Sequence, residues 1–242
     1  MTPSLSVIIP TFNEASRITS TVSALQACLP GLAADWEIRV VDDGSRDETA
    51  DAVMRIGDGN SRVVLQREKH RGKGGAVRAG MLAARHDLRF MCDADLSMPV
   101  VELSRFLALV PDGFDVVIGS REGTGARRIG EPGYRHVMGR AFNALVRSLA
   151  VPRINDTQCG FKLFTGGAAE AIFSRVTLDG WAFDIEALVI AEHLGLRVCE
   201  MPIEWHYRDR SQVSPLRDSV LMARDVVRIR LNAARGLYAR RS

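Results

Sequence analysis

The chain has 242 residues, of which 46% are hydrophobic and 25% charged, and its formal net charge is only +3. This composition is typical of a globular protein with a sizeable core, and no apolar run approaches the roughly 18 residues of a membrane span. Four scattered cysteines without a Cys-x-x-Cys pair argue against a zinc site or a disulfide framework, and the N-terminus lacks the pattern of a signal peptide, so we expect a cytoplasmic protein.

The first half of the chain alternates short β-rich runs with helix-length segments. We predict strands at residues 5–10, 36–43, 62–66, 88–92 and 114–120. Strands separated by helices indicate an α/β fold, with a mainly parallel central sheet flanked by helices in a single domain. Ligands of such sheets bind beyond the carboxyl ends of the strands, so the polar residues that follow these strands are the first candidates for a site.

The second half is less regular. Residues 121–134 have the composition of a loop, and a helix is predicted at about 135–149. A short strand within 156–164 should lie beside the site, followed by an amphipathic helix that starts near residue 183 and a strand at 197–205.

The positive charge is concentrated at the end of the chain. Residues 216–242 carry seven arginines and two aspartates, a net +5, which leaves −2 for residues 1–215. We therefore divide the chain into a domain at 1–215 and a basic amphipathic helix at 216–242, which either packs on the domain or lies against an anionic membrane as a peripheral protein would. No recognition motif accompanies the charge, so no nucleic-acid partner is expected. The apolar stripe of this predicted helix consists of Leu216, Val220, Ala223, Val227, Leu231 and Ala234.

Two aspartates, Asp93 and Asp95, end the apolar run 88–92. Carboxylates at the end of a buried strand repel each other unless a positive group lies between them. A Mg²⁺ or Mn²⁺ ion that joins them to phosphate oxygens would meet that requirement. The alternative is a helix N-cap, in which Asp95 or Ser97 caps the helix that Pro99 begins.

Two other strand ends and a glycine-rich turn offer polar groups. Asp42 and Asp43 can accept hydrogen bonds from a base N–H or from ribose hydroxyls, although a tight Asp-Gly turn is the competing interpretation. Asn13 offers an amide, with a simple turn before a helix as its alternative. The turn "RGKGG" around Lys73 is not the P-loop motif, but glycines at a helix start can present backbone N–H groups to an anion.

Seven segments in this order, "SVIIPTFNE", "VVDDGSRDET", "RGKGGAVRAGM", "DADLS", "VIGSR", "DTQCGFKLF" and "WAFDIEAL", resemble the family 2 glycosyltransferases of the nucleotide-diphospho-sugar GT-A fold. The resemblance covers roughly residues 5–215 and is nearest to dolichyl- and polyprenyl-phosphate sugar synthases. "DTQCGFK" and "PLRDS" favour the β-glucosyltransferase branch, which uses UDP-glucose. The alternative is the GDP-mannose branch, which often has Gln where this chain has Ser97.

The resemblance implies a nucleotide-sugar donor and a Mg²⁺ or Mn²⁺ cofactor. Asp93 and Asp95 are then catalytic and hold the metal ion. Asp184 and Glu186, also candidate catalytic residues, would border the sugar. The donor site, to which the strand-end argument adds Asp42, would comprise Pro10, Thr11, Asn13, Glu14, Asp42, Asp43, Lys73, Gly74, Asp93, Ala94 and Asp95.

The remaining implied positions lie in the second half. Asp156, Gln158 and Trp181 would contact the sugar, with core packing as the alternative for Trp181. Arg121 and Arg135 would hold an acceptor phosphate. The lysine of the family's last loop is replaced here by Gln212, so the substitute for it would be Arg208 or Arg210.

The implied reaction is an inverting hexose transfer, in which the metal stabilises the departing diphosphate. A hydroxyl acceptor would need a general base, which Asp184 or Glu186 would supply, whereas a polyprenyl phosphate is already ionised and needs positive charge instead. Residues 121–140 contain five arginines and two glutamates, which favours the anionic acceptor, with a solvated basic loop as the alternative. A nucleotide-sugar-binding module without turnover is the non-enzymatic alternative, and the oligomeric state stays open.

Overall fold

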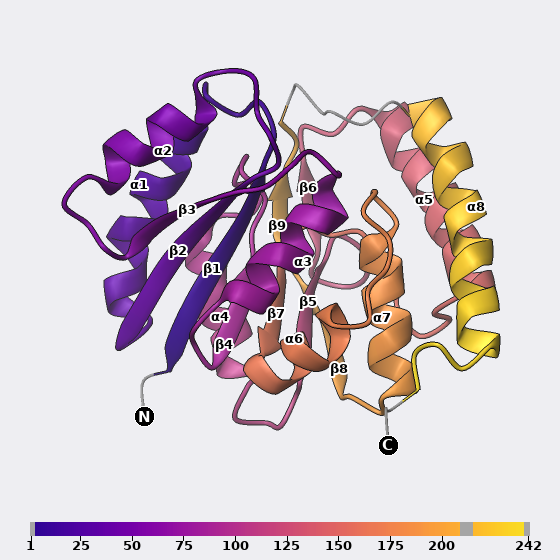
Figure 1. Cartoon of the computed structure of the whole chain (residues 1–242). Coiled ribbons are helices and arrows are strands. Elements are labelled where there is room, and N and C mark those ends of the chain that lie inside the picture. Colours follow the sequence, from indigo (N-terminus) through magenta and orange to yellow (C-terminus); the bar gives the residue numbers. More distant parts are fainter. Residues whose placement is uncertain (1–2, 209–214, 240–242) are drawn as a thin grey trace.

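The computed structural model describes residues 3–208 and 215–239 (Figure 1). The side chains at 135, 137, 138, 141, 142, 145 and 215–220 lie outside that description. The strands are β1 (Ser4–Thr11), β2 (Asp35–Asp42), β3 (Val63–Arg67), β4 (Leu88–Met91), β5 (Val116–Ser120), β6 (Arg127–Ile129), β7 (Lys162–Thr165), β8 (Val198–Pro202) and β9 (Glu204–His206). The α-helices are α1 (Ile18–Cys28), α2 (Thr49–Gly57), α3 (Lys73–Ala83), α4 (Leu103–Ala108), α5 (Gly133–Leu149), α6 (Gly166–Phe173), α7 (Phe183–His193) and α8 (Pro215–Ala234), and short 3₁₀ turns lie at Leu29–Gly31 and Val100–Glu102.

The central sheet has seven strands in the order β3-β2-β1-β4-β7-β5-β8. Every pairing is parallel except those of β7, which runs antiparallel to both β4 and β5. The prediction of an α/β fold with a mainly parallel sheet is therefore confirmed. Strands β6 and β9 form a separate parallel pair.

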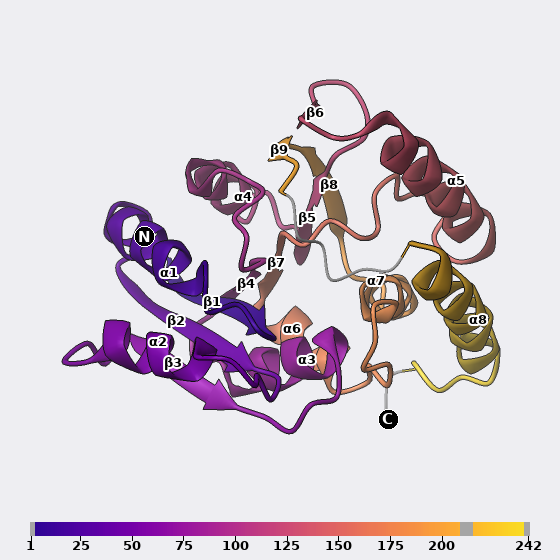
Figure 2. The same ribbon diagram turned by 90° about the horizontal axis from the view of Figure 1, so that it is seen from above.

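Helices cover both faces of the sheet (Figure 2). In β1, Leu5, Val7 and Ile9 pack with residues of α1, α2 and α4, whereas Ile8 packs with residues of α3, α6 and α7. A parallel strand that is buried on both faces is apolar almost throughout rather than alternating, which explains the continuous run "LSVIIP".

The predicted meeting of strand ends is confirmed by the register. In the pairing of β1 with β2, Thr11 lies opposite Asp42, and in the pairing with β4, Ile8 lies opposite Met91. The Cys92 N–H then donates to the carbonyl of Ile8, so β4 delivers the following aspartates to the same edge of the sheet.

Two predicted strands differ from the observed ones. The strand predicted within 156–164 is reduced to β7, because residues 156–161 form a buried turn beside the site. The strand predicted at 197–205 is divided by Ile203, whose backbone N–H bonds to Ser120, so that β8 joins the main sheet and β9 pairs with β6. Helices α4 and α6 were not predicted, because six and eight residues are too short to show a clear helical period.

Helix α8 packs through a different stripe from the one predicted. Met222, Val226 and Ile229 are buried in the core. Val227 and Leu231, which belong to the predicted stripe, are 52% and 51% exposed. The helix is therefore apolar on two faces, and the three-or-four spacing does not say which face meets the domain. Within residues 3–208 and 215–239, no helix combines the length and hydropathy needed to cross a bilayer.

The residues after α8 return to the core. Gly236 adopts a φ of 71°, a left-handed conformation that suits glycine, and the Tyr238 side chain is 0% exposed. Its hydroxyl donates to Oε1 of Glu186 in α7 at 2.8 Å. The end of the described chain is thus fastened to the domain by a buried hydrogen bond to a charged acceptor.

Replacing Tyr238 with Phe is expected to lower the free energy of unfolding by about 1–3 kcal/mol, because one bond to the buried Glu186 carboxylate is lost. Urea denaturation at neutral pH measures the change. The matched control is Leu237→Ala, which changes a side chain that is 59% exposed and should cost much less. Equal losses for the two variants would contradict the role of the hydrogen bond.

Candidate active site

The turn that carries Asp93 and Asp95 is held by hydrogen bonds within the turn and from α1. The Ser97 N–H donates to Oδ1 of Asp95 at 2.9 Å, and the Thr21 hydroxyl of α1 donates to the carbonyl of Ala94 at 2.6 Å. Leu96 has a φ of 45°, which is rare for a residue with a side chain and costs about 1–3 kcal/mol. The surrounding structure must therefore stabilise this turn.

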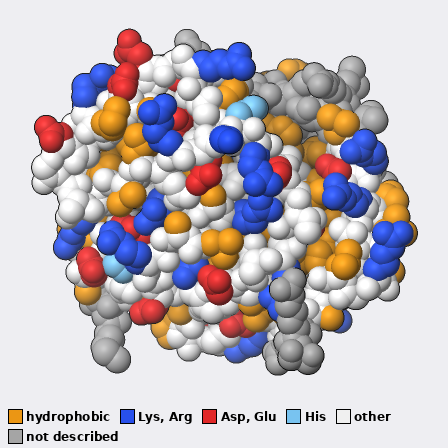
Figure 3. Space-filling model, viewed as in Figure 1, with side chains coloured by type: hydrophobic (Ala, Val, Ile, Leu, Met, Phe, Trp, Pro, Cys, Tyr) orange, Lys and Arg blue, Asp and Glu red, His pale blue; other side chains and the backbone are white. Residues whose placement is uncertain are grey.

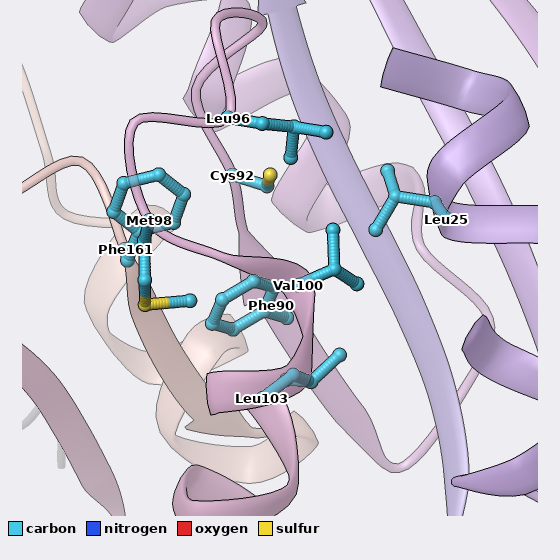
Figure 4. Close-up of a pocket in the computed structure, with 8 residues that line it drawn as sticks. All are labelled: Leu25, Phe90, Cys92, Leu96, Met98, Val100, Leu103 and Phe161. Atoms are coloured by element: carbon cyan, nitrogen blue, oxygen red, sulfur yellow. The ribbon is translucent and has the colours of Figure 1, made fainter. Parts of the chain in front are cut away.

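Packing below the turn supplies that stabilisation (Figure 4). An apolar pocket, too tight to admit water, lies between α1, β4 and the start of α4, and Leu96 points into it. Dispersion contacts in such a space hold the backbone in its unusual conformation. The pocket is lined by Leu25, Phe90, Cys92, Leu96, Met98, Val100, Leu103 and Phe161.

The positive group beside the two aspartates is Lys73. Its Nζ lies 2.6 Å from Oδ1 of Asp93, at the start of α3. Burial alone would lower the pKa of Lys73, but Asp93, Asp184 and Asp95 together raise it, so the ammonium stays charged. Burial, followed by the charge of Asp93, raises the pKa of Asp95. Asp95 is therefore the carboxylate whose charge is less well compensated.

Gly160 fixes the position of Asp93 from the other side. A Cβ at residue 160 would lie only 1.8 Å from Oδ2 of Asp93, so no residue with a side chain fits there without moving the carboxylate. Asp93 thus touches two segments that are far apart in the sequence, the start of α3 and the turn 156–161.

The donor residues predicted at the end of β1 form a connected corner. Pro10 and Thr11 close the strand, and the Thr11 hydroxyl donates to the carbonyl of Val41 at 3.2 Å. Asn13 has a φ of 57°, and its side-chain oxygen accepts from the Arg46 N–H. The Thr11 hydroxyl and the Asn13 side-chain oxygen are thus both engaged in hydrogen bonds within the protein.

The negative charges of Asp93 and Asp95 act on the carboxyl group of Glu14. Burial raises its pKa, the Arg17 guanidinium at 2.6 Å opposes that shift, and Asp95 and Asp93 add to it. This corner of the site therefore carries excess negative charge.

Asp42 and Asp43 differ in what they contact. Asp43 accepts from the backbone N–H groups of Arg71 and Gly72 at 2.8 and 2.9 Å, so its carboxylate shapes the glycine-rich turn. Asp42 accepts from Ser45 through Oδ1, but its Oδ2 is buried without a hydrogen-bond partner. Both carboxylates are buried, and Asp42 differs from Asp43 in having one oxygen without a hydrogen-bond partner.

The glycine-rich turn binds the Asp43 carboxylate through two of its backbone N–H groups, and its other glycines are covered by another part of the chain. A Cβ at Gly74 would lie 2.6 Å from the carbonyl oxygen of Leu178, and one at Gly72 would lie 2.6 Å from that of Asp179. The N–H of Gly75 already bonds to Asp179. The absence of side chains at these glycines therefore lets the segment 178–183 pack directly against the turn. Gly74, predicted to contact the nucleotide-sugar donor, is buried beneath this segment.

Arg121 and Asp156, predicted to contact different ligands, contact each other. The guanidinium donates through Nε and Nη2 to both oxygens of Asp156 at 2.7 and 2.8 Å, and the Arg121 N–H adds a third bond. Asp156 is 0% exposed. Burial alone would raise its pKa, but Arg121 lowers the pKa of Asp156 to about 2. The sugar-contacting role of Asp156 is thus corrected, because this carboxylate is enclosed and positions Arg121.

Glu186 is not available as a general base. It is 0% exposed, and its carboxylate accepts from the Thr177 N–H and hydroxyl, the Leu178 N–H and the Tyr238 hydroxyl. These four bonds saturate both oxygens, so the predicted catalytic role of Glu186 is corrected to that of an anchor for the segment that covers Gly74.

Asp184 is also enclosed. It is 4% exposed, and its Oδ1 lies 2.6 Å from Nζ of Lys162, which is itself 1% exposed. Burial raises the pKa of Asp184, against the opposing charges of Lys162 and Lys73. Its hydrogen-bond partner is the buried ammonium of Lys162, and Lys73 acts on it only through its charge.

The two other residues predicted to contact the sugar are Trp181 and Gln158, which lie in different surroundings. Nζ of Lys73 lies 5.5 Å from the ring centroid of Trp181, and this ring also packs against the core. Nε2 of Gln158 lies 3.2 Å from Sδ of Met222 in α8. Trp181 is thus next to the Lys73–Asp93 pair, whereas Gln158 contacts the helix.

The arginines of loop 121–140 are less free than their number suggested. Arg121 pairs with Asp156, and Arg127 pairs with Glu204 at 3.1 Å. Arg128 pairs with Glu122 at 2.7 Å and with Glu131 at 2.8 Å. The expectation of a strongly basic loop is therefore corrected, because carboxylates, some from outside the loop, neutralise these three guanidinium groups.

Three acceptor-phosphate candidates remain beyond that loop. Arg208 is exposed just after β9. The side chain of Arg135 and the whole of Arg210 lie outside the described residues, as does Gln212.

Three residues of the site were missed in the sequence. Lys162 could have been found from its place in the apolar run "GFKLF", because a lysine within such a run needs a buried counter-ion. Gly160 stood within a quoted motif but had no assigned reason. Thr21 lies in an ordinary helix, and nothing in the sequence indicates that its hydroxyl holds Ala94.

The carboxylate oxygens of this site suit a divalent cation that completes its coordination shell with oxygen atoms of the substrate. Among the described residues, no group of three or more His, Cys, Asp and Glu side chains is placed to enclose a metal. Asp95 and Asp93 alone supply hard oxygen ligands, and Mg²⁺ commonly binds one or two carboxylates together with substrate phosphates. The raised pKa of Asp95 is the mark of a carboxylate that gains from a nearby positive charge.

Gly160→Ala is expected to weaken the binding of UDP-glucose with Mn²⁺ by at least about tenfold, because the new methyl group displaces the Asp93 carboxylate from Lys73. Isothermal titration measures the affinity, and circular dichroism checks the fold. Gly167→Ala is the control, since a Cβ there meets nothing within 4 Å. Unchanged affinity in Gly160→Ala would refute the assignment of Asp93 to the donor site.

Asp156→Asn is expected to lower the free energy of unfolding at pH 7 by about 3 kcal/mol, because Arg121 loses its buried counter-ion. The folded-state pKa of Asp156 is depressed from 3.8 to about 2, so this stabilisation is present above pH 3.8 and is lost as pH falls toward 2. Urea titrations between pH 7 and pH 3 should show the wild type and the variant converging. The exposed Asp58→Asn is the control and should show no such convergence.

Comparison with known proteins places this chain in a family. The model for "Glycosyl transferase family 2" matches residues 6–172. The dolichyl-phosphate beta-glucosyltransferase of Dictyostelium discoideum is 34% identical, over 97% of this chain and 76% of that protein. The protein of the same name from Homo sapiens is 32% identical, over 98% and 78%.

Solved structures share the fold at lower identity. Mannosyl-3-phosphoglycerate synthase from Rubrobacter xylanophilus superposes with a TM-score of 0.70 at 19% identity, over 97% of this chain and 76% of that one. Glucosyl-3-phosphoglycerate synthase from Mycobacterium tuberculosis, solved with Mn²⁺, UDP and glucosyl-3-phosphoglycerate, gives 0.67 at 20% identity, over 96% and 79%. The chain therefore belongs to glycosyl transferase family 2 and has the GT-A fold.

Proposed function

We propose that this protein transfers glucose from UDP-glucose to a polyprenyl phosphate, with inversion at the sugar and with a bound Mg²⁺ or Mn²⁺ ion. The relatives above, named for glucosyl transfer to dolichyl phosphate, align over almost the whole chain. The structural neighbour solved with Mn²⁺ and UDP is in keeping with a metal and a uridine donor.

The observation that carries the proposal is the enclosure of the two candidate bases. Glu186 has four hydrogen bonds and no exposed surface, and Asp184 is held by Lys162. A hydroxyl acceptor must lose a proton as it attacks, whereas a phosphate monoester is already ionised. A site whose two candidate bases are enclosed therefore favours the phosphate over a soluble hydroxyl acceptor.

The residues at the sheet edge have separate tasks in this proposal. Asp93, held by Lys73 and Gly160, orients the sugar and keeps the ammonium close to the donor. Asp95 and Asp93 would hold the metal, which when bound supplies positive charge to the departing diphosphate. Asp42 offers its unpartnered Oδ2 to the nucleoside, and Trp181 borders the sugar.

The acceptor phosphate is assigned to arginines of the second half of the chain. Arg208 is exposed just after β9, and Arg121 is kept in place by Asp156. Arg135 and Arg210 complete the assignment on the evidence of the sequence alone. A lipid acceptor also implies that the protein works at a membrane surface, as a peripheral cytoplasmic protein.

Labelled UDP-glucose tests the function with two acceptors of the same chain length, a short polyprenyl phosphate and the corresponding polyprenol. Transfer to the phosphate alone is expected, with loss of turnover on chelation of divalent metal. Asp95→Asn should reduce kcat/KM by about 100-fold or more, whereas the exposed Asp112→Asn should not. UDP-galactose, UDP-GlcNAc and GDP-mannose serve as competing donors.

Three results would contradict the proposal. Equal transfer to the polyprenol would mean that a general base operates, and faster transfer from GDP-mannose would assign a different donor. Binding of UDP-glucose without transfer or hydrolysis would indicate a nucleotide-sugar-binding module.

A further inference from the structure

The outward side of α8 exposes two large aliphatic side chains between arginines, and nothing in the described structure covers them. We define the outer face of α8 as residues 224, 227, 228, 231 and 235, which are all exposed. Val227 and Leu231 lie along its middle, 52% and 51% exposed, while Met222, Val226 and Ile229 face the core. Large aliphatic side chains at adjacent turns of one helix face form a continuous stripe rather than isolated surface residues.

Arginines border this stripe. Arg224 and Arg228 are exposed and lie on one side of Leu231, and Arg235 follows directly after the end of the helix. Asp225 is half-buried, seven residues from the buried Asn232, and it interacts electrostatically with both Arg224 and Arg228. Among the described side chains of α8 the arginines outnumber this carboxylate, so the balance of charge on the outer face is positive.

The neighbouring helix extends this basic surface. Helix α5 packs beside α8 on the same side of the molecule (Figures 1 and 2). The stretch 133–149 contains no Asp or Glu, and its Arg140 and Arg147 are exposed. Along the right-hand side of the molecule, where α8 lies, basic and hydrophobic side chains predominate, with an acidic side chain among them (Figure 3).

We propose that the outer face of α8 docks on the surface of an anionic lipid bilayer. Val227 and Leu231 would enter the boundary between headgroups and acyl chains, while the arginines reach the lipid phosphates. This inference deepens the proposed function, since a polyprenyl phosphate acceptor lies in a membrane. A second copy of the chain fits less well, because a twofold contact would bring two sets of arginines together, and the arginines outnumber Asp225.

Point variants of the full chain are the right test, because removing α8 would also remove Met222, Val226 and Ile229 from the core. The probe is co-sedimentation with phosphatidylcholine vesicles, with and without phosphatidylglycerol. Wild-type protein should bind only the anionic vesicles and should be released by salt.

Two matched pairs of variants separate the charge from the apolar stripe. Arg224→Gln/Arg228→Gln should weaken vesicle partitioning by about twenty-five-fold, at about fivefold for each arginine, whereas the exposed control Arg55→Gln/Arg67→Gln should not. Leu231→Gln should weaken it by at least about tenfold. Its control is Met54→Gln, since Met54 and Leu231 are both 51% exposed.

The outcomes separate this inference from the proposed function. Transfer to a short polyprenyl phosphate in detergent, without vesicles, should be unchanged in all four variants, so loss of binding with retained transfer supports the docking surface alone. Wild-type protein that ignores phosphatidylglycerol, or controls that lose binding equally, would overturn it. A dimer in analytical ultracentrifugation that Leu231→Gln dissociates, without vesicle binding, would overturn it in favour of a second copy.

Discussion

The carboxylate of Asp93 is the contact on which the rest of the site depends. One of its oxygens meets the ammonium of Lys73, and the other lies against the α-carbon of Gly160. The end of β4, the start of α3 and the turn before β7 are therefore fixed relative to one another at a single point. The same turn presents Asp156, which holds Arg121, so a displacement at Gly160 would reach Arg121 as well.

A second centre, at Glu186, joins the C-terminal half to this arrangement. Its carboxylate binds the backbone of residues 177–178 on one side and the Tyr238 hydroxyl on the other. The segment that begins there covers Gly72 and Gly74, next to Lys73. The hydrogen bonds of Glu186 thus support the segment that lies next to the Lys73–Asp93 pair. Helix α8 has one face packed on the domain and one exposed face.

The sheet and the location of the site could be predicted from the sequence because both depend on local patterns. Apolar runs identified the strands, and residues directly after them had to meet at one edge, as Asp42 and Asp93 do. The errors concern partners that are distant in the sequence. Arg121 and Asp156 are 35 residues apart and Glu186 and Tyr238 are 52 apart, so neither pairing leaves a local signal. The packed face of α8 was missed for a different reason, because the two apolar faces of this helix have the same spacing in the sequence.

The antiparallel strand β7 has a consequence for how the chain assembles. Strands β4 and β5 are not neighbours, since β7 lies between them and pairs with both. The four strands β3, β2, β1 and β4 can therefore form a layer early in synthesis, but its β4 edge stays unpaired until residues 162–165 leave the ribosome. The two halves of the sheet join only then, and the insertion of this four-residue strand is the step at which a nascent chain is most exposed to pairing with the wrong partner.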